Sequence, residues 1–170
     1  MKKIKEGEMN RIVSSRHQLS SYIDSPHQYD FFLNTIYSTL CQLDAEYPHF
    51  YSWYYGKVTQ DVKAKRRDIL FSISTDHYIS GIVILKNFNS EKKICTIRVP
   101  EKYQRNGLGK ALIINAMNIL NTEKPLITVS SKKNIQFKRL FSYFGYTKTE
   151  EKQGFYLNDA TENIFNGILI

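Results

Sequence analysis

The sequence has few of the residues that indicate disulfide, metal or membrane chemistry. Among 170 residues it has two cysteines and four histidines, and it lacks an apolar run of the about 18 residues that a membrane-spanning helix needs. Cys41 and Cys95 stand in apolar patterns, which predicts buried free thiols in a reducing compartment rather than a disulfide. His17, His27 and His77 show no metal-ligand spacing with one another or with the cysteines, so we expect no metal site.

Acidic residues are also scarce relative to basic ones. The chain has 16 acidic and 24 basic residues, a formal net charge of +8 and a pI near 9.4. Such a surface attracts anionic partners, which include phosphorylated small molecules and nucleic acid. The basic run Lys63, Lys65, Arg66 and Arg67 is expected to form a solvated face.

The first residues are basic, but no apolar run follows them as it would in a signal peptide. We therefore expect a cytoplasmic protein.

What the sequence does contain is enough apolar surface for one folded domain over residues 1–170. Apolar residues make up 42% and aromatic residues 14% of the chain, which argues against disorder. Hydrophobic spacing predicts the element order β-α-α-β-β-β-α-β-α-β-β. In chain order, the expected elements are a strand near Met9–Ser15, helices from Pro26 and over Phe50–Val62, strands over Asp68–Thr75, Tyr78–Phe88 and Lys93–Val99, a helix over Ala111–Leu120, a strand over Pro125–Ser130, a helix from Asn134, and strands near Thr147–Glu151 and Asn163–Ile170.

The most informative segment is the glycine-containing turn between the strand ending at Val99 and the helix starting near Ala111. The amide N–H groups at a helix start lack intrahelical partners, and glycine lets a phosphate approach the main chain. The spacing does not fit a dinucleotide fingerprint, because Leu112 stands where the third glycine is needed, nor a P-loop. The remaining pattern is Gln104-x-x-Gly107-x-Gly109, which predicts an anion site.

A second segment, Asn134–Tyr146, combines an asparagine, an apolar helical pattern and an aromatic–glycine–aromatic end. Together with the turn, it resembles the paired motifs of the GCN5-related N-acetyltransferases, in the same order and at the same separation. This resemblance covers essentially the whole chain. It implies an α/β fold with a single mixed, mostly antiparallel central sheet flanked by helices, the acyl-CoA N-acyltransferase fold.

The resemblance also implies how acetyl-CoA, used as a co-substrate, would bind. The pantetheine arm would pair with the strand backbone at Ile97, Arg98 and Val99, and the pyrophosphate would lie on the turn. The implied turn residues are Gln104, Arg105, Asn106, Gly107, Leu108, Gly109 and Lys110. Asn134 and Phe141 complete the implied site, and Phe141 departs from the family, because many members have there a tyrosine that protonates the leaving thiolate.

The groups that transfer protons are not identified by the sequence. Candidates for the general base are Asp44, Glu46, Tyr47 and His49, in the turn between the first two predicted helices, and each is also an ordinary surface residue. Glu101 lies beside the glycine turn, where it could also be a loop cap. The proton donor is either elsewhere in the chain or water.

The sequence therefore predicts a cytoplasmic N-acetyltransferase that transfers the acetyl group from acetyl-CoA to a primary amine. The acceptor is left open between small molecules and peptides, and the oligomeric state between monomer and homodimer. Two alternatives stay open. The absence of the tyrosine favours a non-catalytic acyl-CoA-binding module, and the basic pI gives weak support to a toxin-like enzyme that acetylates aminoacyl-tRNA or other RNA.

Overall fold

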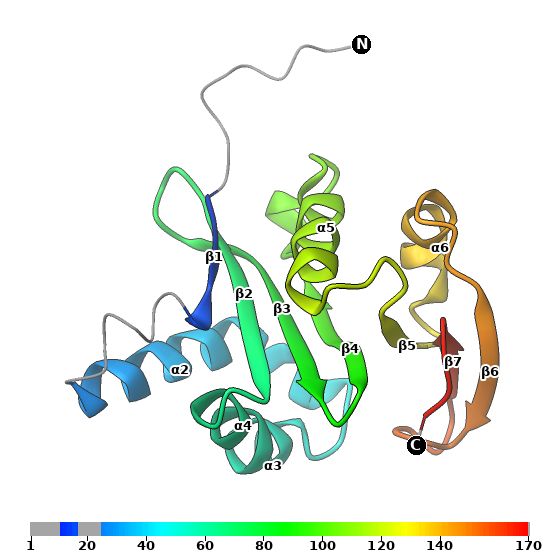
Figure 1. Cartoon of the computed structure of the whole chain (residues 1–170), viewed down its shortest axis with the longest axis horizontal. Helices are drawn as coiled ribbons and strands as arrows, with labels where there is room; N and C mark the ends of the chain where they lie inside the picture. The colour runs from blue at the N-terminus through cyan, green and yellow to red at the C-terminus, as the bar shows by residue number, and fades with distance from the viewer. Residues whose placement is uncertain (1–10, 17–24, 170) are drawn as a thin grey trace.

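The computed structural model describes residues 11–16 and 25–169, in which seven strands form one sheet of order β1-β2-β3-β4-β5-β7-β6 (Figure 1). The strands are β1 (Arg11–Ser14), β2 (Arg67–Ile73), β3 (Ile79–Phe88), β4 (Glu91–Arg98), β5 (Leu126–Ser130), β6 (Lys148–Gln153) and β7 (Thr161–Phe165). The helices are α2 (Pro26–Leu40), α3 (Phe50–Trp53), α4 (Thr59–Lys63), α5 (Leu108–Leu120) and α6 (Asn134–Tyr143), with short 3-10 turns η1 (Cys41–Ala45) and η3 (Glu101–Tyr103) and a π turn η2 (Tyr54–Val58). All neighbouring strands are antiparallel except β4 and β5. The predicted mixed α/β fold and element order are confirmed, while Met9 and Asn10 of the first expected strand lie outside the described residues.

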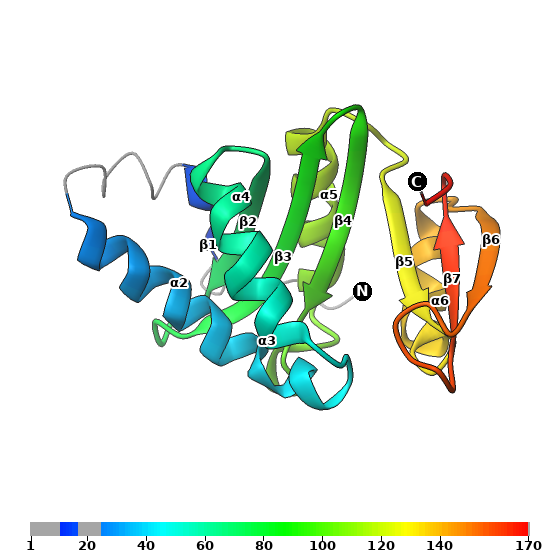
Figure 2. The ribbon, with the colours of Figure 1, turned by 90° about the horizontal axis from the view of Figure 1, so that it is seen from below.

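Helices cover both faces of the sheet, and each face has its own apolar core (Figure 2). On one face, the apolar positions of α2 recur with helical spacing and are buried against β2 and β3 together with α3 and α4. On the other face, α5 and α6 pack on the opposite sides of the same strands and on β5 and β7. Within the described residues, no helix combines the length and apolar character that crossing a bilayer requires.

The second predicted helix is one helical segment with a π turn at its centre. Phe50 and Tyr54 are buried at the start of this segment, and the Tyr54 hydroxyl donates to the Leu33 carbonyl of α2 at 2.8 Å. Gly56 lies within the π turn, where a Cβ would have no atom within 4 Å. The aromatic rings in this segment therefore serve mainly to fix α3 on α2 and the sheet.

The last strand differs from the sequence-based expectation. β7 ends at Phe165, because Asn166 has a left-handed φ of 62° that turns the chain out of the sheet. Ile168 and Leu169 do not extend it, and Ile168 is exposed, while Ile170 lies outside the described residues. The predicted strand Asn163–Ile170 was thus placed too far toward the C-terminus, and this placement left Glu162 outside it.

The sheet is interrupted between β4 and β5. These parallel strands pair only at Lys93 with Leu126 and at Ile94 with Ile127, and their ribbons diverge toward their carboxyl ends (Figure 2). A register shift in the β3–β4 pairing, between Ile84 and Leu85, leaves Cys95 as an extra residue where the divergence begins. We refer to Cys95–Arg98 of β4 and Thr128–Ser130 of β5 as the splay.

Close packing of α5 on the sheet requires a glycine at position 81 of β3. A Cβ there would lie 2.7 Å from Leu112 Cδ1 and 3.0 Å from Ser72 Oγ. Leu112 is fully buried, so its side chain has little room to move. We expect Gly81→Ala to lower the free energy of unfolding by about 1–3 kcal/mol, the usual cost of overpacking. Urea unfolding tests this, with Gly56→Ala, where no atom would be contacted, as the control; equal stability of the two variants would contradict it.

Candidate functional site

The glycine turn leads from the end of β4 to the start of α5 and is fixed by local bonds. The Gln104 side-chain amide donates to the Val99 carbonyl at 2.8 Å, which ties the turn to the strand. Arg105 and Gly107 have left-handed φ values of 65° and 85°, and these reverse the chain direction. The Asn106 side-chain oxygen accepts from the Leu108 N–H at 3.2 Å and thereby caps α5.

This turn presents unused hydrogen-bond donors. Within the described residues, the N–H groups of Arg105, Asn106, Gly107, Gly109 and Lys110 have no protein acceptor. The segment from Gln104 to Gly107 is exposed, and no atom lies within 4 Å of a Cβ built on Gly107. Because the partial positive charge of the α5 dipole is at the same place, the turn is suited to bind an anion.

Basic side chains lie beside the turn and on α6. Lys102 forms an ion pair with Asp76 at 3.1 Å, whereas the Lys110 ammonium lies 3.8 Å from the centre of the Tyr143 ring in α6. Lys138 and Arg139 line a surface depression on α6. Among the described residues, no acidic partner is found for Lys110, Lys138 or Arg139. Their charges are therefore available to an anionic ligand with several phosphates.

The strand edge beside the turn is open to pairing. Of the described strands, none pairs with the β5-facing edge of β4 beyond Ile94, so an extended ligand could bind there in the manner of an added strand. Ile97 and Val99 pack partly against the core beneath α5. Arg98 points to the opposite face, where its guanidinium donates to the Gln42 side chain in η1.

The two predicted residues of α6 have different environments. Asn134 is the first residue of the helix and is half-buried. Phe141 is buried, with its ring 4.7 Å from that of Phe165 in β7. Tyr143 points elsewhere, as its position in the helix predicts, and is 63% exposed beside Lys110. Phe141 thus contributes an apolar packing surface, and its position near the reacting sulfur stays a prediction.

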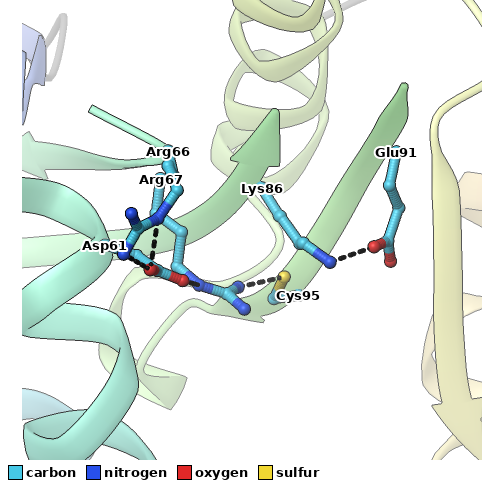
Figure 3. A network of polar contacts seen from close by, with 6 residues as sticks. All are labelled: Asp61, Arg66, Arg67, Lys86, Glu91 and Cys95. Carbon is cyan, nitrogen blue, oxygen red and sulfur yellow. Dashed lines mark hydrogen bonds and ion pairs between the residues drawn. The ribbon is translucent and has the colours of Figure 1, made fainter. Parts of the chain in front are cut away.

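A buried polar network fixes the first residue of the splay (Figure 3). The Arg67 guanidinium donates to Asp61 at 3.0 Å and to the Cys95 sulfur at 2.9 Å. Burial raises the pKa of the Cys95 thiol, and the positive charge of Arg67 opposes this rise. Burial alone would also raise the pKa of Asp61. The hydrogen bonds that Arg66 and Arg67 donate to its carboxylate outweigh this effect and hold the pKa of Asp61 below the usual value.

This network corrects two sequence-based expectations. Arg67 is only 4% exposed, so it does not belong to a solvated basic face; the burial is possible because Asp61 supplies the opposite charge. Both cysteines are free, as predicted, but Cys41 is exposed at the start of η1 rather than buried. The helical apolar pattern ends just before it, at Leu40.

On the α2–α4 side, the loop after η1 crosses the splay. Glu46 lies 2.6 Å from the Lys133 ammonium at the start of α6, and the Tyr47 ring lies 6.3 Å from that of Tyr156, which follows β6. Of the other proposed bases, exposed Asp44 is bonded to the Tyr37 hydroxyl and to the Tyr51 N–H. His49 is exposed with a φ of 67°, and exposed Glu101 starts η3. The roles of the four candidate bases and of Glu101 remain predictions.

Sequence reasoning did not identify Glu162, a buried carboxyl group near this loop. It is 2% exposed, and burial raises its pKa from 4.5 to about 7, opposed only by the charge of Lys93. Its nearest sequence signal is the alternation of Glu162 with apolar Ile164, which puts both on one face of a strand. In the described part of the chain, no cluster of histidine, cysteine or acidic residues has a metal-binding arrangement.

The sequence profile of the acetyltransferase (GNAT) domain matches residues 46–156, which include the turn, the splay and α6. The chain belongs to the GNAT acetyltransferase family. A comparison with curated protein sequences finds no match. The matched region of this GNAT protein ends before β7, so it does not include Glu162.

Solved structures support the fold of this GNAT protein. A protein assigned to the family from Desulfovibrio desulfuricans is 14% identical, with a TM-score of 0.62 over 93% of this chain and 95% of that one. A GNAT acetyltransferase from Elizabethkingia anophelis with acetyl-CoA bound is 18% identical, with a TM-score of 0.50 over 64% and 80% of the two chains. Spermidine N-acetyltransferase from Vibrio cholerae is 16% identical, with a TM-score of 0.51 over 62% and 67%.

Proposed function

We propose that this protein transfers the acetyl group of acetyl-CoA to the primary amine of an acceptor. The observation that carries the proposal is the exposed turn at Gln104–Gly107, in which the main-chain N–H groups of Arg105, Asn106 and Gly107 have no acceptor among the described residues. These groups and the start of α5 would hold the diphosphate of CoA. The basic side chains near the turn could bind the additional phosphate of CoA. The positive charge of this region therefore does not require a nucleic-acid partner.

The thioester end of the same molecule would lie along the free edge of β4 at Ile97, Arg98 and Val99. A main-chain N–H at this edge would stabilise the negative charge that develops on the acetyl oxygen. The acceptor amine would approach from the face of the sheet that α2, α3 and α4 cover, where Tyr47 and Tyr156 lie. The similarity of the fold to that of a spermidine N-acetyltransferase supports an amine as acceptor.

Isothermal titration with acetyl-CoA tests the binding step, for which we expect 1:1 binding that weakens as salt is added, because phosphate contacts are screened. A screen of polyamines, aminoglycoside-type amines and lysine peptides, read by CoA release and by product mass, tests the transfer. Absence of acetyl-CoA binding by the folded protein would overturn the proposal. Binding without transfer to any amine would favour the second candidate, a non-catalytic acyl-CoA-binding module. This candidate is also supported by Phe141, because a phenylalanine has no proton to donate to the leaving thiolate.

A further inference from the structure

Glu162 carries a buried carboxyl group with an unsatisfied oxygen atom. Its Oε1 atom has no hydrogen-bond partner among the described residues, and the side chain is 2% exposed. A buried acceptor without a partner costs roughly 1–3 kcal/mol. Lys152 is opposite Glu162 on β6, but its ammonium is directed to the Leu169 carbonyl at 3.4 Å and to the Phe155 ring.

Strand register places Glu162 at the level of the predicted thioester. Glu162 pairs with Ser130 of β5, three residues beyond Ile127, and Ile127 pairs with Ile94 of β4. Since β4 and β5 run in parallel and Cys95 is an extra residue in β4, the residue level with Ser130 is Arg98, within the stretch where the pantetheine arm would pair. Advancing three residues along a strand covers about 10 Å. Glu162 is therefore on the far side of the splay from the free edge of β4.

The side chain of Glu162 points to the face from which the acceptor would come. Ile127 and Val129 pack in the core beneath α5 and α6, and side chains alternate along a strand, so Ser130 and its partner Glu162 face the α2–α4 side. This is the side on which the loop containing Tyr47 crosses the splay. Tyr156, after β6, lies beside Tyr47.

The titratable groups around Glu162 come from several parts of the chain. Lys93 of β4 is buried, and its pKa is lowered by that burial. The charge of Glu162 acts on Tyr47 and on Tyr156, whose pKa values burial raises to about 12. Glu46, the remaining acid of the crossing loop, is paired with Lys133. Near neutral pH this environment leaves Glu162 able both to take up and to release a proton.

We propose that Glu162 is the general base that removes a proton from the acceptor amine. This role rests on the proposed function, because it requires an amine and a thioester in the splay. The carboxylate takes one proton from the ammonium form of the acceptor, and the neutral nitrogen then attacks the acetyl carbon. A C–N bond forms, the C–S bond breaks, and the electron pair leaves with the CoA sulfur. The second amine proton goes to that thiolate, and Glu162 releases its proton to solvent.

Glu162→Gln tests this role, because the amide keeps the shape of the side chain but cannot accept the proton. We expect kcat to fall roughly 100-fold or more, the usual contribution of a general base, while acetyl-CoA binding measured by titration stays within about twofold. In the wild type, log kcat/KM should rise with pH and level off near pH 7, and the variant should lack this transition. Glu162→Asp, which keeps a shortened base, should retain the transition with a lower kcat. Exposed Glu123→Gln is the matched control.

The possible failures are distinguishable. A Gln variant that keeps wild-type kcat and the transition near pH 7 would overturn the role of Glu162 and leave the proposed function intact. A wild-type protein that binds acetyl-CoA but acetylates no amine would overturn both. A third outcome is that the Gln variant loses acetyl-CoA binding or cooperative thermal unfolding, while the Asp variant keeps the wild-type kcat and pH profile. Glu162 would then be a structural residue, and its role as a base would also be overturned.

Discussion

As pH rises from about 4 to about 8, the free energy of unfolding of the Glu162→Gln variant should increase by roughly 3 kcal/mol relative to that of the wild type. The pKa of Glu162 is raised from 4.5 to about 7 by burial. In this window the folded wild type binds more protons than the unfolded chain, so its stability falls as pH rises from 4.5 through about 7. The variant has no such group, so its stability lacks this decrease.

Urea unfolding of both proteins at several pH values measures this difference. Asp61, Asp76 and Asp159 have pKa values below the ordinary 3.8, so their stabilising effect is lost only at lower pH and in both proteins. Glu123→Gln, at an exposed position, should follow the wild type at every pH. A stability difference between the Glu162 variant and the wild type that does not change with pH would show that this carboxyl group titrates normally.

Replacing Gly107 by alanine should lower the affinity for acetyl-CoA roughly 10- to 100-fold. The φ of 85° at Gly107 is left-handed, a conformation that costs an L-residue about 1–2 kcal/mol. The new Cβ would also project into the open space above the turn, where no protein atom lies within 4 Å and where the diphosphate would bind. The turn would then relax, and its N–H groups would no longer point to one place.

Gly145→Ala is the matched control for this substitution. Gly145 has a similar φ of 60° but lies at the end of α6, far along the chain from the turn. Gly145→Ala should lose at least as much stability in thermal unfolding, because its Cβ would lie 3.2 Å from Lys124 Nζ, whereas only Gly107→Ala should weaken acetyl-CoA binding in titration calorimetry. Equal affinities of the two variants would mean that the turn does not bind the diphosphate.

The sequence was sufficient for the order of the elements and for the glycine turn, because both depend on local patterns. Helical spacing located α2 and α5, and the two glycines located the turn before α5, although this helix starts at Leu108 rather than near Ala111. Burial of charged groups was not predictable, because it depends on partners distant in sequence. Arg67 is buried because Asp61 and Cys95 lie beside it. Glu162 was missed because the end of β7 is set by the turn at Asn166 rather than by the apolar residues after it.

The divergence of β4 and β5 has a consequence for how the protein depends on its co-substrate. Only two residue pairs join these strands, so little main-chain bonding holds the halves of the sheet together. A pantetheine arm on the free edge of β4 would supply part of the missing bonding and link both halves. Acetyl-CoA would then act as a removable structural element, so melting temperature should rise with its concentration and fall again after turnover releases the product.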